Sequence, residues 1–438
     1  MLALNQLTFA RNDCNIFSPV SFTLKAGELL QITGANGSGK STLLRLIAGL
    51  IEPTEGRLEI HADFNYIGHS NAHQGSLTAR ENLQVAAAFL GITLTNDAQI
   101  QILKQAGIEH LIDTQVKYFS AGQARRLALA RLLIQPSTLW LLDEPTAGLD
   151  ISAQRWFEEI LATHLSRGGM AVVVTHQVMD HFKNSTSITL TQCDNNANTT
   201  PYLPAIVTEK KMDDTKNASI LTLAYYEILA TYREAHAWLT PLLFFVMAAT
   251  LFPLAVGANI PLLHTIAPSM IWVIALLAIL LSTDTIFRTD IASGRLDFVL
   301  SHKNILSDFV ISKILCHWIT HALPLVLLSP IIGGLFGLSL SEMGILTFSV
   351  FTGTFILSLI GSLGAAIVAG IRGHGLLLPI LIMPFYIPVL IFGTNMVLAY
   401  SQQQPISAYI AILIALTLLS ATFTPLFTQL ALKTGVNQ

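Results

Sequence analysis

A glycine-rich stretch near the N-terminus has the residue types needed to hold phosphate. Gly34, Gly39, Lys40 and Ser41 match the spacing G-x-x-x-x-G-K-[ST]. Glycines let a backbone approach phosphate closely, loop amides and a helix N-terminus favour its negative charge, lysine reaches the terminal phosphates, and serine can hold Mg²⁺. We therefore expect ATP to contact the whole stretch: Gly34, Ala35, Asn36, Gly37, Ser38, Gly39, Lys40, Ser41 and Thr42.

An acidic pair follows about a hundred residues later. Residues 139–142, LWLL, have the character of a buried strand, which ends in Asp143 and Glu144. At such a position Asp143 can support Mg²⁺, and Glu144 can polarise an attacking water. A pair of helix-capping carboxylates is the structural alternative, but the phosphate-binding stretch upstream favours the catalytic interpretation.

The elements that must position these residues alternate in type. Short β-prone runs at 29–33, 139–142 and 170–174 alternate with helical stretches such as 41–50 and 123–134. This alternation predicts an α/β domain with a largely parallel sheet over residues 1–190. Residues 191–217 are polar, rich in Asn and Thr and interrupted by prolines, and we expect a linker or domain edge there.

Composition separates this first part from residues 218–438. Hydrophobic residues make up 52% of the chain and charged residues 12%, which is too apolar for a wholly soluble protein. A net charge of −3 argues against a general nucleic-acid surface. Cys14, Cys193 and Cys316 have no metal-ligand spacing and are too few for a disulfide framework, which indicates a reducing compartment for the soluble part.

Six apolar stretches in the second half are long enough to cross a bilayer. They lie at roughly 238–257, 268–287, 317–337, 343–370, 376–399 and 406–430, and each meets the roughly 20 residues that about 30 Å of hydrocarbon requires. A large soluble core is the alternative. Six such runs predict an all-α domain with six transmembrane helices.

The basic residues of the second half predict its orientation. If Arg233 is cytoplasmic, the loops near 288–304 and 371–375 and the C-terminal end share its side. All lysines and arginines beyond position 218 fall on that side or in the adjoining helix: Arg233, Arg288, Arg295, Lys303, Lys313, Arg372 and Lys433. The opposite loops near 258–267, 338–342 and 400–405 have none, which is the charge asymmetry that orients membrane proteins. The N-terminus lacks the pattern of a secretory signal, so we expect both termini, and the ATP-binding half, in the cytoplasm.

The run FSAGQ, residues 119–123, lies between the glycine-rich stretch and the acidic pair. Here the chain resembles the ATPases of ABC transporters. Their LSGGQ signature is represented in this chain by FSAGQ, with Ala121 in place of the first glycine. The resemblance extends to the EPT run that begins at Glu144, to AGLD ending at Asp150 and to VVVTHQ containing His176. Together these motifs span nearly all of residues 1–190 and imply an α/β P-loop ABC nucleotide-binding domain.

This resemblance implies roles for further residues. The signature of one cassette closes over ATP held by a second, so two copies of the chain are required. His176 is expected to contact the γ-phosphate and to orient Glu144, and both are predicted catalytic residues, while Ser41 and Asp143 are predicted Mg²⁺ ligands. Further ATP contacts are expected from Ser120, Ala121, Gly122, Gln123 and Asp150.

Two positions depart from the usual ABC pattern. The aromatic residue that stacks on adenine is absent, and Phe9 and the Arg11 guanidinium are the alternatives. Where most cassettes have glutamine at the end of a Tyr-x-x-Gln run, this chain reads YIGH. We favour His69 as its replacement at the ATP site, with Gln74 as the alternative.

Among ABC cassettes, YIGHSN and SLTARENL resemble the ATPase subunit of the cytochrome c maturation (Ccm) system, often called the haem exporter. The second half resembles its membrane subunit, particularly at residues 287–304, FRTDIASGRLDFVLSHKN. The chain thus resembles a CcmA-like ATPase fused to a CcmB-like permease. The resemblance implies a haem-handling membrane protein and a haem chaperone as partners, with haem only as a possible cargo.

The loop at 288–304 is the candidate for mechanical coupling, through Arg288, Asp290, Arg295 and Asp297, and is expected to dock near His69. A solvated basic loop that only orients the adjacent spans is the alternative.

His317 and His321 lie four residues apart, so they share one face of a helix. Imidazole suits haem iron, but packing or hydrogen bonding explains them more simply.

The main hypothesis is a homodimeric membrane ABC ATPase of cytochrome c maturation. Its competitors are an ABC exporter of another small molecule, lipid or polysaccharide, and a soluble-type ABC ATPase that regulates a partner.

Overall fold

The computed structural model describes residues 1–11, 14–176, 178–179, 181–182, 184–191, 206–209, 219–257, 259–302, 305–371 and 377–435. Most of the expected linker at 191–217, together with Cys193, Lys303 and Arg372, lies outside them. The chain divides into two compact units. The first, here called the ATPase unit, comprises residues 1–218 and 290–305; the second, the membrane unit, comprises residues 219–289 and 306–436.

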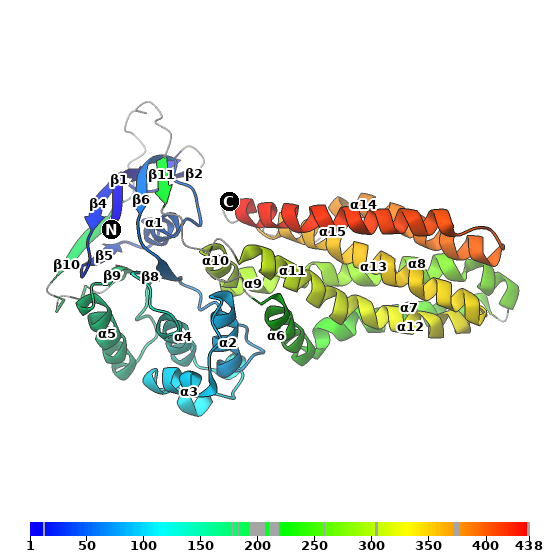
Figure 1. Cartoon of the computed structure of the whole chain (residues 1–438), viewed down its shortest axis with the longest axis horizontal. Helices are drawn as coiled ribbons and strands as arrows, with labels where there is room; N and C mark the ends of the chain where they lie inside the picture. Colours follow the sequence, from blue (N-terminus) through cyan, green and yellow to red (C-terminus); the bar gives the residue numbers. More distant parts are fainter. Residues whose placement is uncertain are drawn as a thin grey trace. The chain divides into compact units, whose positions relative to one another are not determined.

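A parallel five-stranded sheet forms the centre of the ATPase unit (Figure 1). Its order is β10-β5-β9-β8-β7, and every neighbouring pair is parallel. The three expected strands are confirmed as β5 (Leu29–Gly34), β8 (Leu139–Asp143) and β9 (Met170–Val174), joined by β7 (Phe64–Ile67) and β10 (Ser185–Leu190). Strands β8 and β9 are buried along their whole length, as expected for strands covered on both faces.

A second sheet of order β11-β6-β1-β4 packs against the first. Strand β1 (Leu2–Thr8) pairs antiparallel with β4 (Val20–Leu24) and β6 (Glu55–Ile60), and β11 (Ile206–Glu209) pairs parallel with β6. Buried side chains of both sheets and of α1 (Lys40–Ile47) form one apolar core. A small hairpin, β2 (Ala10–Arg11) and β3 (Cys14–Asn15), completes the strands.

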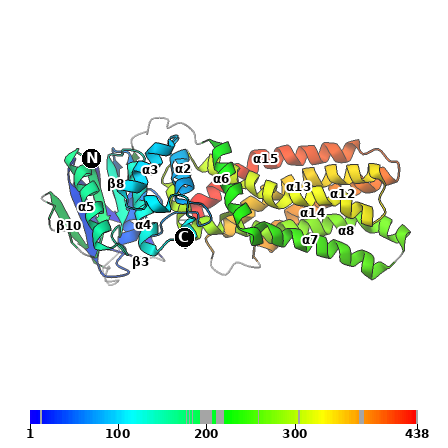
Figure 2. The same ribbon diagram turned by 90° about the horizontal axis from the view of Figure 1, so that it is seen from below.

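The remaining helices of the ATPase unit have clear start signals. Thr78 and Ser120 begin α2 (Ala79–Phe89) and α4 (Ala121–Ala130) with capping boxes, in which their side chains and those of Glu81 and Gln123 bind each other's backbone N–H. Helices α3 (Asn96–Gln105) and α5 (Ile151–Ser166) and the short 3₁₀ turns Glu109–Leu111, Val116–Tyr118 and Arg131–Leu133 complete the set. Figure 2 shows α2, α3 and α4 close together, and their buried residues share one apolar cluster.

The segment expected as a coupling loop is helical instead. Helix α9 (Thr285–Ser293) ends next to Gly294, whose φ of 78° turns the chain into α10 (Arg295–Leu300). The apolar residues of α10 explain the difference, because Leu296, Phe298 and Val299 are buried and a helix satisfies the backbone polar groups that go with them.

Within the described residues, the membrane unit contains six helical spans long and apolar enough to cross a membrane, as expected. The first span is α7 (Ala235–Val256), and the second, 260–293, combines α8 (Ile260–Thr283) with α9. The third, 306–335, consists of α11 (Leu306–His317), a π-turn (Trp318–Ala322) and α12 (Leu323–Leu335). The last three spans are α13 (Leu340–Val368), α14 (Leu377–Ser401) and α15 (Ser407–Gly435). The second and third spans begin earlier than predicted. The second begins after Asn259, whose side chain caps α8 by accepting a hydrogen bond from Leu262 N. Helix α6 (Ile220–Arg233) precedes the spans.

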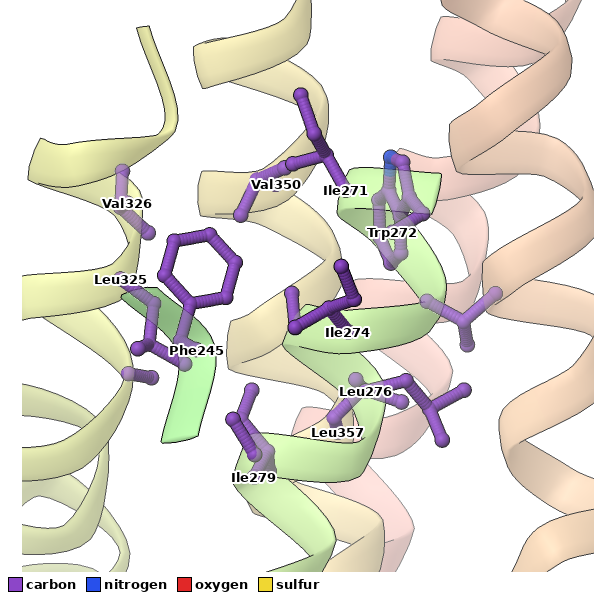
Figure 3. Close-up of a cluster of buried hydrophobic side chains, with 14 of the residues drawn as sticks. Phe245, Ile271, Trp272, Ile274, Leu276, Ile279, Leu325, Val326, Val350 and Leu357 are labelled. Atoms are coloured by element: carbon purple, nitrogen blue, oxygen red, sulfur yellow. The ribbon is translucent and has the colours of Figure 1, made fainter. Parts of the chain in front are cut away.

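Side chains of several spans meet in one apolar cluster (Figure 3). Trp272 is fully buried, and its indole N–H donates to Ser349 Oγ at 3.0 Å. A Cβ at Gly353 or Gly393 would lie 2.0 or 2.2 Å from the indole ring, so glycine is required on both neighbouring helices. A Cβ at Gly361 of α13 would similarly meet Tyr386. These small residues let the helices of the membrane unit pack closely.

Candidate nucleotide site

The order of the parallel sheet brings four separate motifs to one edge. The phosphate-binding stretch begins at Gly34, the last residue of β5, and Asp143 ends β8, with Glu144 directly after it. His176 follows β9, and His69 follows β7. These strands are consecutive neighbours in the order β5-β9-β8-β7, and the carboxyl ends of parallel strands face the same way. Residues far apart in the sequence therefore share one site.

The phosphate loop has the backbone shape that its glycines predict. Gly39 has a φ of 90° as it enters α1, and a Cβ at Gly34 would lie 2.6 Å from the carbonyl oxygen of Leu190. Lys40 is 6% exposed, and its Nζ donates to the carbonyl oxygens of Gly34 at 2.9 Å and Ala35 at 2.8 Å. The ammonium group is thus fixed against the loop that would surround a phosphate.

Asp143 is the candidate metal ligand at this edge. Its side chain is 2% exposed, and its Oδ1 has no hydrogen-bond partner in the part of the chain that the structure describes. Burial raises the pKa of this carboxyl, opposed by a hydrogen bond to Ser41. A buried oxygen without a partner, next to a serine hydroxyl, is the donor set that Mg²⁺ prefers, so both predicted ligands fit the ion.

Glu144 and His176 are in direct contact. His176 Nε2 lies 3.1 Å from Glu144 Oε1, and both side chains are partly exposed. Glu144 has a φ of 46°, a left-handed conformation uncommon for a residue other than glycine. Such backbone strain is typical of functional sites.

The FSAGQ run forms the N-terminus of α4. Ser120 and Ala121 are exposed, and Ser120 Oγ accepts from Gln123 N at 3.2 Å. A Cβ at Gly122 would lie 2.8 Å from the carbonyl oxygen of Gly148, so this glycine allows α4 to approach the AGLD run closely. The open helix start can receive an anion.

Asp150 has a local structural partner. It caps α5 by accepting from Ala153 N at 2.9 Å, and its carboxylate also accepts from Arg126. The hydrogen bond from the Ala153 amide, followed by one from Ser152, lowers the pKa of Asp150.

His69 and Gln74, the two alternatives at the departure from the ABC pattern, face different partners. His69 lines a cavity of about 210 Å³ together with Ser41 and Asp143. Gln74 Oε1 instead accepts from Arg295 Nη1 at 3.0 Å. His69 therefore lies on the side of the predicted Mg²⁺ ligands, and Gln74 lies against α10.

The predicted coupling residues fall into two groups. Arg295 and Asp290 are 3% and 0% exposed and form an ion pair at 2.9 Å, and Asp297 pairs with Arg45 of α1 at 3.3 Å. The segment docks on residues 70–74, where Ala72 N donates to Ser293 O at 2.8 Å. It is therefore not a solvated loop.

Arg288 belongs to the other group: its side chain is 70% exposed and pairs with Asp284 at 3.2 Å.

Two alternatives remain for the contact with adenine. Phe9 is partly buried against the sheet core, whereas Arg11 is exposed on β2.

The membrane histidines have protein partners. His317 Nε2 lies 3.0 Å from Ser282 Oγ and its Nδ1 lies 3.1 Å from Ser358 Oγ. His321 stacks on His317 at 4.9 Å within the stretch that contains the π-turn. Both ring nitrogens of His317 are thus engaged, which agrees with the hydrogen-bonding interpretation for His317. His321 Nδ1 lies 2.8 Å from Thr320 Oγ1, while its Nε2 is buried with no hydrogen-bond partner among the described residues.

Sequence reasoning missed Arg125 and Arg45. Arg125 lies two residues after Gln123 and is 4% exposed, and Arg45 lies one turn after Ser41. A basic residue on a mostly apolar helical stretch is the signal that could have found Arg125, because a buried arginine needs several acceptors.

The phosphate loop, acidic strand end, signature helix and histidine at one sheet edge define an ABC-type ATPase, here followed in the chain by a helical membrane unit. The ABC transporter family model matches residues 17–147, and the model described as CcmB protein matches residues 218–435. The chain belongs to the ABC transporters of cytochrome c biogenesis, with its N-terminal part in the CcmA family and its C-terminal part in the CcmB family.

Two relatives illustrate the division. The cytochrome c biogenesis ATP-binding export protein CcmA of Dechloromonas aromatica (strain RCB) is 41% identical over 189 residues, which cover 40% of this chain and 93% of that protein. Heme exporter protein B of Pseudomonas aeruginosa is 40% identical over 207 residues, 47% of this chain and 93% of that protein. One chain thus combines what these relatives carry separately. A solved ATP-binding subunit of an ABC transporter is 23% identical and covers 44% of this chain and 90% of that chain, with a TM-score of 0.39.

Proposed function

We propose that this chain couples ATP hydrolysis to haem export, or to release of a haem-loaded chaperone, during cytochrome c maturation. The observation that carries the proposal is the similarity of its two parts to a cytochrome c biogenesis ATP-binding export protein and to a heme exporter protein. Haem is the cargo in this proposal, not a resident cofactor. A haem-translocating ATPase is the corresponding enzyme class.

The chemistry requires few groups. Glu144 polarises the attacking water, and His176, 3.1 Å from it, holds the carboxylate in place and contacts the γ-phosphate. Lys40 and the loop amides neutralise phosphate charge. Ser41 and Asp143 hold Mg²⁺, which, when bound, supplies Lewis-acid polarisation of the phosphate oxygens.

The working unit in this proposal is a homodimer. The exposed N-terminus of α4, with Ser120 and Ala121, is free to meet ATP held by the phosphate loop of a second copy. Purified protein should therefore contain two copies, and full ATPase activity in a monomer would contradict the composite site.

In this proposal, the conformational change that accompanies ATP binding and hydrolysis in the ATPase unit passes to the membrane unit through residues 290–302. The hydrogen bond from Arg295 to Gln74 and the Arg45–Asp297 pair support this role, because they tie the segment to residues 70–74 and to the phosphate-loop helix, while the buried Asp290–Arg295 pair holds the segment together internally. Arg288 has the weaker case among the predicted coupling residues, since it is exposed.

The proposed location is the bacterial inner membrane, with the ATPase unit and both termini in the cytoplasm. The one-sided distribution of lysine and arginine supports this orientation. The partners are a haem-handling membrane protein and a haem chaperone.

Glu144→Gln tests the function in a strain in which it is the only copy. The variant should bind ATP and assemble normally but lose turnover, leave haem on the chaperone and abolish holocytochrome c. Glu159→Gln, an exposed glutamate of α5, is the matched control. Normal holocytochrome c in the Glu144→Gln strain would overturn the proposal.

A further inference from the structure

Arg125 donates hydrogen bonds from all five of its N–H groups. It lies on α4 and is 4% exposed. Its acceptors are the carbonyl oxygens of three consecutive residues at the end of β8, one more carbonyl and one side-chain amide oxygen: Asp143 O, Glu144 O at 3.0 Å, Pro145 O at 3.4 Å, Gly68 O at 3.0 Å and Asn71 Oδ1 at 3.1 Å. No donor of the guanidinium is left unused.

The first three acceptors explain how Glu144 keeps its unusual backbone. Consecutive carbonyls of an extended strand point in alternate directions, so they do not converge on one donor group. Here the left-handed φ of 46° at Glu144 accompanies their convergence on the guanidinium of Arg125. A strained conformation persists only where its surroundings fix it. Arg125 supplies that restraint by binding the backbone carbonyl oxygens of Glu144 and of the residues on either side of it.

The other two acceptors belong to the segment that carries His69. Gly68 O and Asn71 Oδ1 share Nη1 of Arg125, and His69 lies between them in the sequence. The same segment continues to Ala72, whose amide donates to Ser293 O next to α10. Arg125 therefore binds both the end of β8 and the segment around His69, which in turn contacts α9 and α10.

The position of Arg125 on its helix adds a third connection. Gln123, which closes the capping box at the start of α4, lies two residues before it. Displacement of this helix start therefore displaces the guanidinium. Burial lowers the pKa of Arg125 to about 10, so the group stays charged near neutral pH.

We propose that Arg125 is a positioning residue that fixes Glu144 for hydrolysis and links its placement to the signature helix and to the His69 segment. The link between two ATP sites rests on the proposed homodimer, in which the start of α4 meets the ATP of the second copy. Closure at one site then adjusts Glu144 of the other through one side chain. The positioning of Glu144 within one chain does not depend on the cargo.

The chemistry of the side chain makes the proposal testable. Lysine keeps the charge but carries its three donors on a single nitrogen. It can therefore donate to some of these acceptors but cannot reproduce the forked arrangement of five donors. Methionine has similar length and offers no donor. The graded series Arg, Lys, Met therefore separates hydrogen bonding from packing.

The test uses the full chain in detergent or nanodiscs. We expect Arg125→Met to lower kcat about 100-fold and Arg125→Lys about 10-fold, because small misplacements of a catalytic group have effects of this size. The KM for ATP should change less than about threefold, since neither the phosphate loop nor Lys40 contacts Arg125 in the hydrogen bonds described. Partial rescue by lysine is the specific signature of positioning.

Two controls separate positioning from general destabilisation. Leu161→Ala creates a cavity in the core beside α5, away from these hydrogen bonds, and should lower the melting temperature without a comparable loss of kcat. Arg80→Lys changes an arginine that pairs with Asp113 at 3.0 Å and should leave kcat unchanged. If Leu161→Ala reproduces the kinetics of Arg125→Lys at equal melting temperature, or if lysine and methionine give equal kcat, the proposal is overturned.

Coupling to the His69 segment has its own measurement. Asn71→Ala removes one acceptor, and its effect on kcat should be less than additive with that of Arg125→Lys, because both changes act on the same contact. Full additivity would overturn the link. Loss of ATPase turnover in Arg125→Met with normal holocytochrome c would support the positioning role but contradict the proposed function, so the two failures are distinguishable.

Discussion

His176 and Glu144 meet through a single contact between Nε2 and Oε1 at 3.1 Å. They come from adjacent parallel strands, β9 and β8, and lie 32 residues apart in the sequence. The imidazole is 47% exposed and the carboxylate 26%, so both remain accessible to water. The contact restricts the direction in which the carboxylate faces.

Replacing this histidine should separate binding from turnover. We expect His176→Ala to lower kcat for ATP hydrolysis by about 100-fold, because a misdirected carboxylate no longer polarises the attacking water. ATP affinity should stay within about threefold, since the phosphate loop is unchanged. Steady-state ATPase assays and nucleotide-binding titrations measure the two effects. His61→Ala, an exposed histidine after β6, is the control, and a loss of affinity equal to the loss of kcat would contradict the assignment.

His73 should make the ATPase unit sensitive to acid. Burial and then the positive charge of Arg131 lower the pKa of His73 from 6.5 to about 3. The neutral form is favoured in the folded state, so its contribution to stability is complete above pH 6.5 and decreases as the pH falls toward 3. At about pH 5 the loss should reach about 1 to 2 kcal/mol.

The His73→Gln variant checks this titration, because its amide can still donate to Ala124 O, which lies 2.9 Å from Nε2 of His73. Its unfolding midpoint should fall less than that of the unmodified chain between about pH 7.5 and pH 5. His61→Gln should behave like the unmodified chain. Parallel curves for all three proteins would rule out His73 as the titrating group.

Gly353 should be required for packing in the membrane unit. A Cβ there would lie 2.0 Å from the Trp272 ring, so Gly353→Ala should destabilise the unit by about 1 to 3 kcal/mol. Gly344 lies in the same helix, where an added Cβ would meet nothing within 4 Å, and Gly344→Ala is the matched control. Thermal unfolding in detergent compares the two, and Trp272→Phe should partly restore Gly353→Ala. Equal melting temperatures for both alanine variants would refute the packing argument.

The sequence predicted the elements of the ATPase unit well because their signals are local. The GxxxxGK[ST] spacing and the apolar run before Asp143 each depend on a few neighbouring residues, and the helical stretch expected at 123–134 overlaps α4, which begins earlier, after Ser120. The same holds for the spans, whose apolar length is visible directly. The order of strands β5-β9-β8-β7 was not predictable in this way, because it depends on contacts between distant segments.

The residues that were missed act through long-range contacts. Arg125 reaches acceptors 18 to 57 residues away, and Arg45 pairs with Asp297 across 252 residues. No periodicity reports such partners. The helical form of residues 295–300 was missed for a related reason, since its apolar side chains are buried by contacts within the ATPase unit that the local sequence does not reveal.

His69 and Gln74 should have separable roles, because one lines the cavity at Ser41 and Asp143 and the other binds Arg295. We expect His69→Ala to lower kcat by about 10-fold and to raise the Mg²⁺ concentration needed for half-maximal activity. Gln74→Ala should keep that Mg²⁺ dependence and instead lower the amount of holocytochrome c made per ATP hydrolysed. Mg²⁺ titrations of the ATPase, followed by cytochrome assays in cells, measure both quantities.

Arg295→Gln should resemble Gln74→Ala in this assay, with an added loss of stability, because it leaves Asp290 buried without the arginine charge. Gln84→Ala is the matched control, since Gln84 donates to Leu94 O at 3.0 Å. A double variant of Gln74 and Arg295 should lose no more coupling than the worse single variant, because both remove one contact. If Gln74→Ala instead shifts the Mg²⁺ requirement while His69→Ala does not, the two roles are reversed, and the glutamine is the residue that serves the metal.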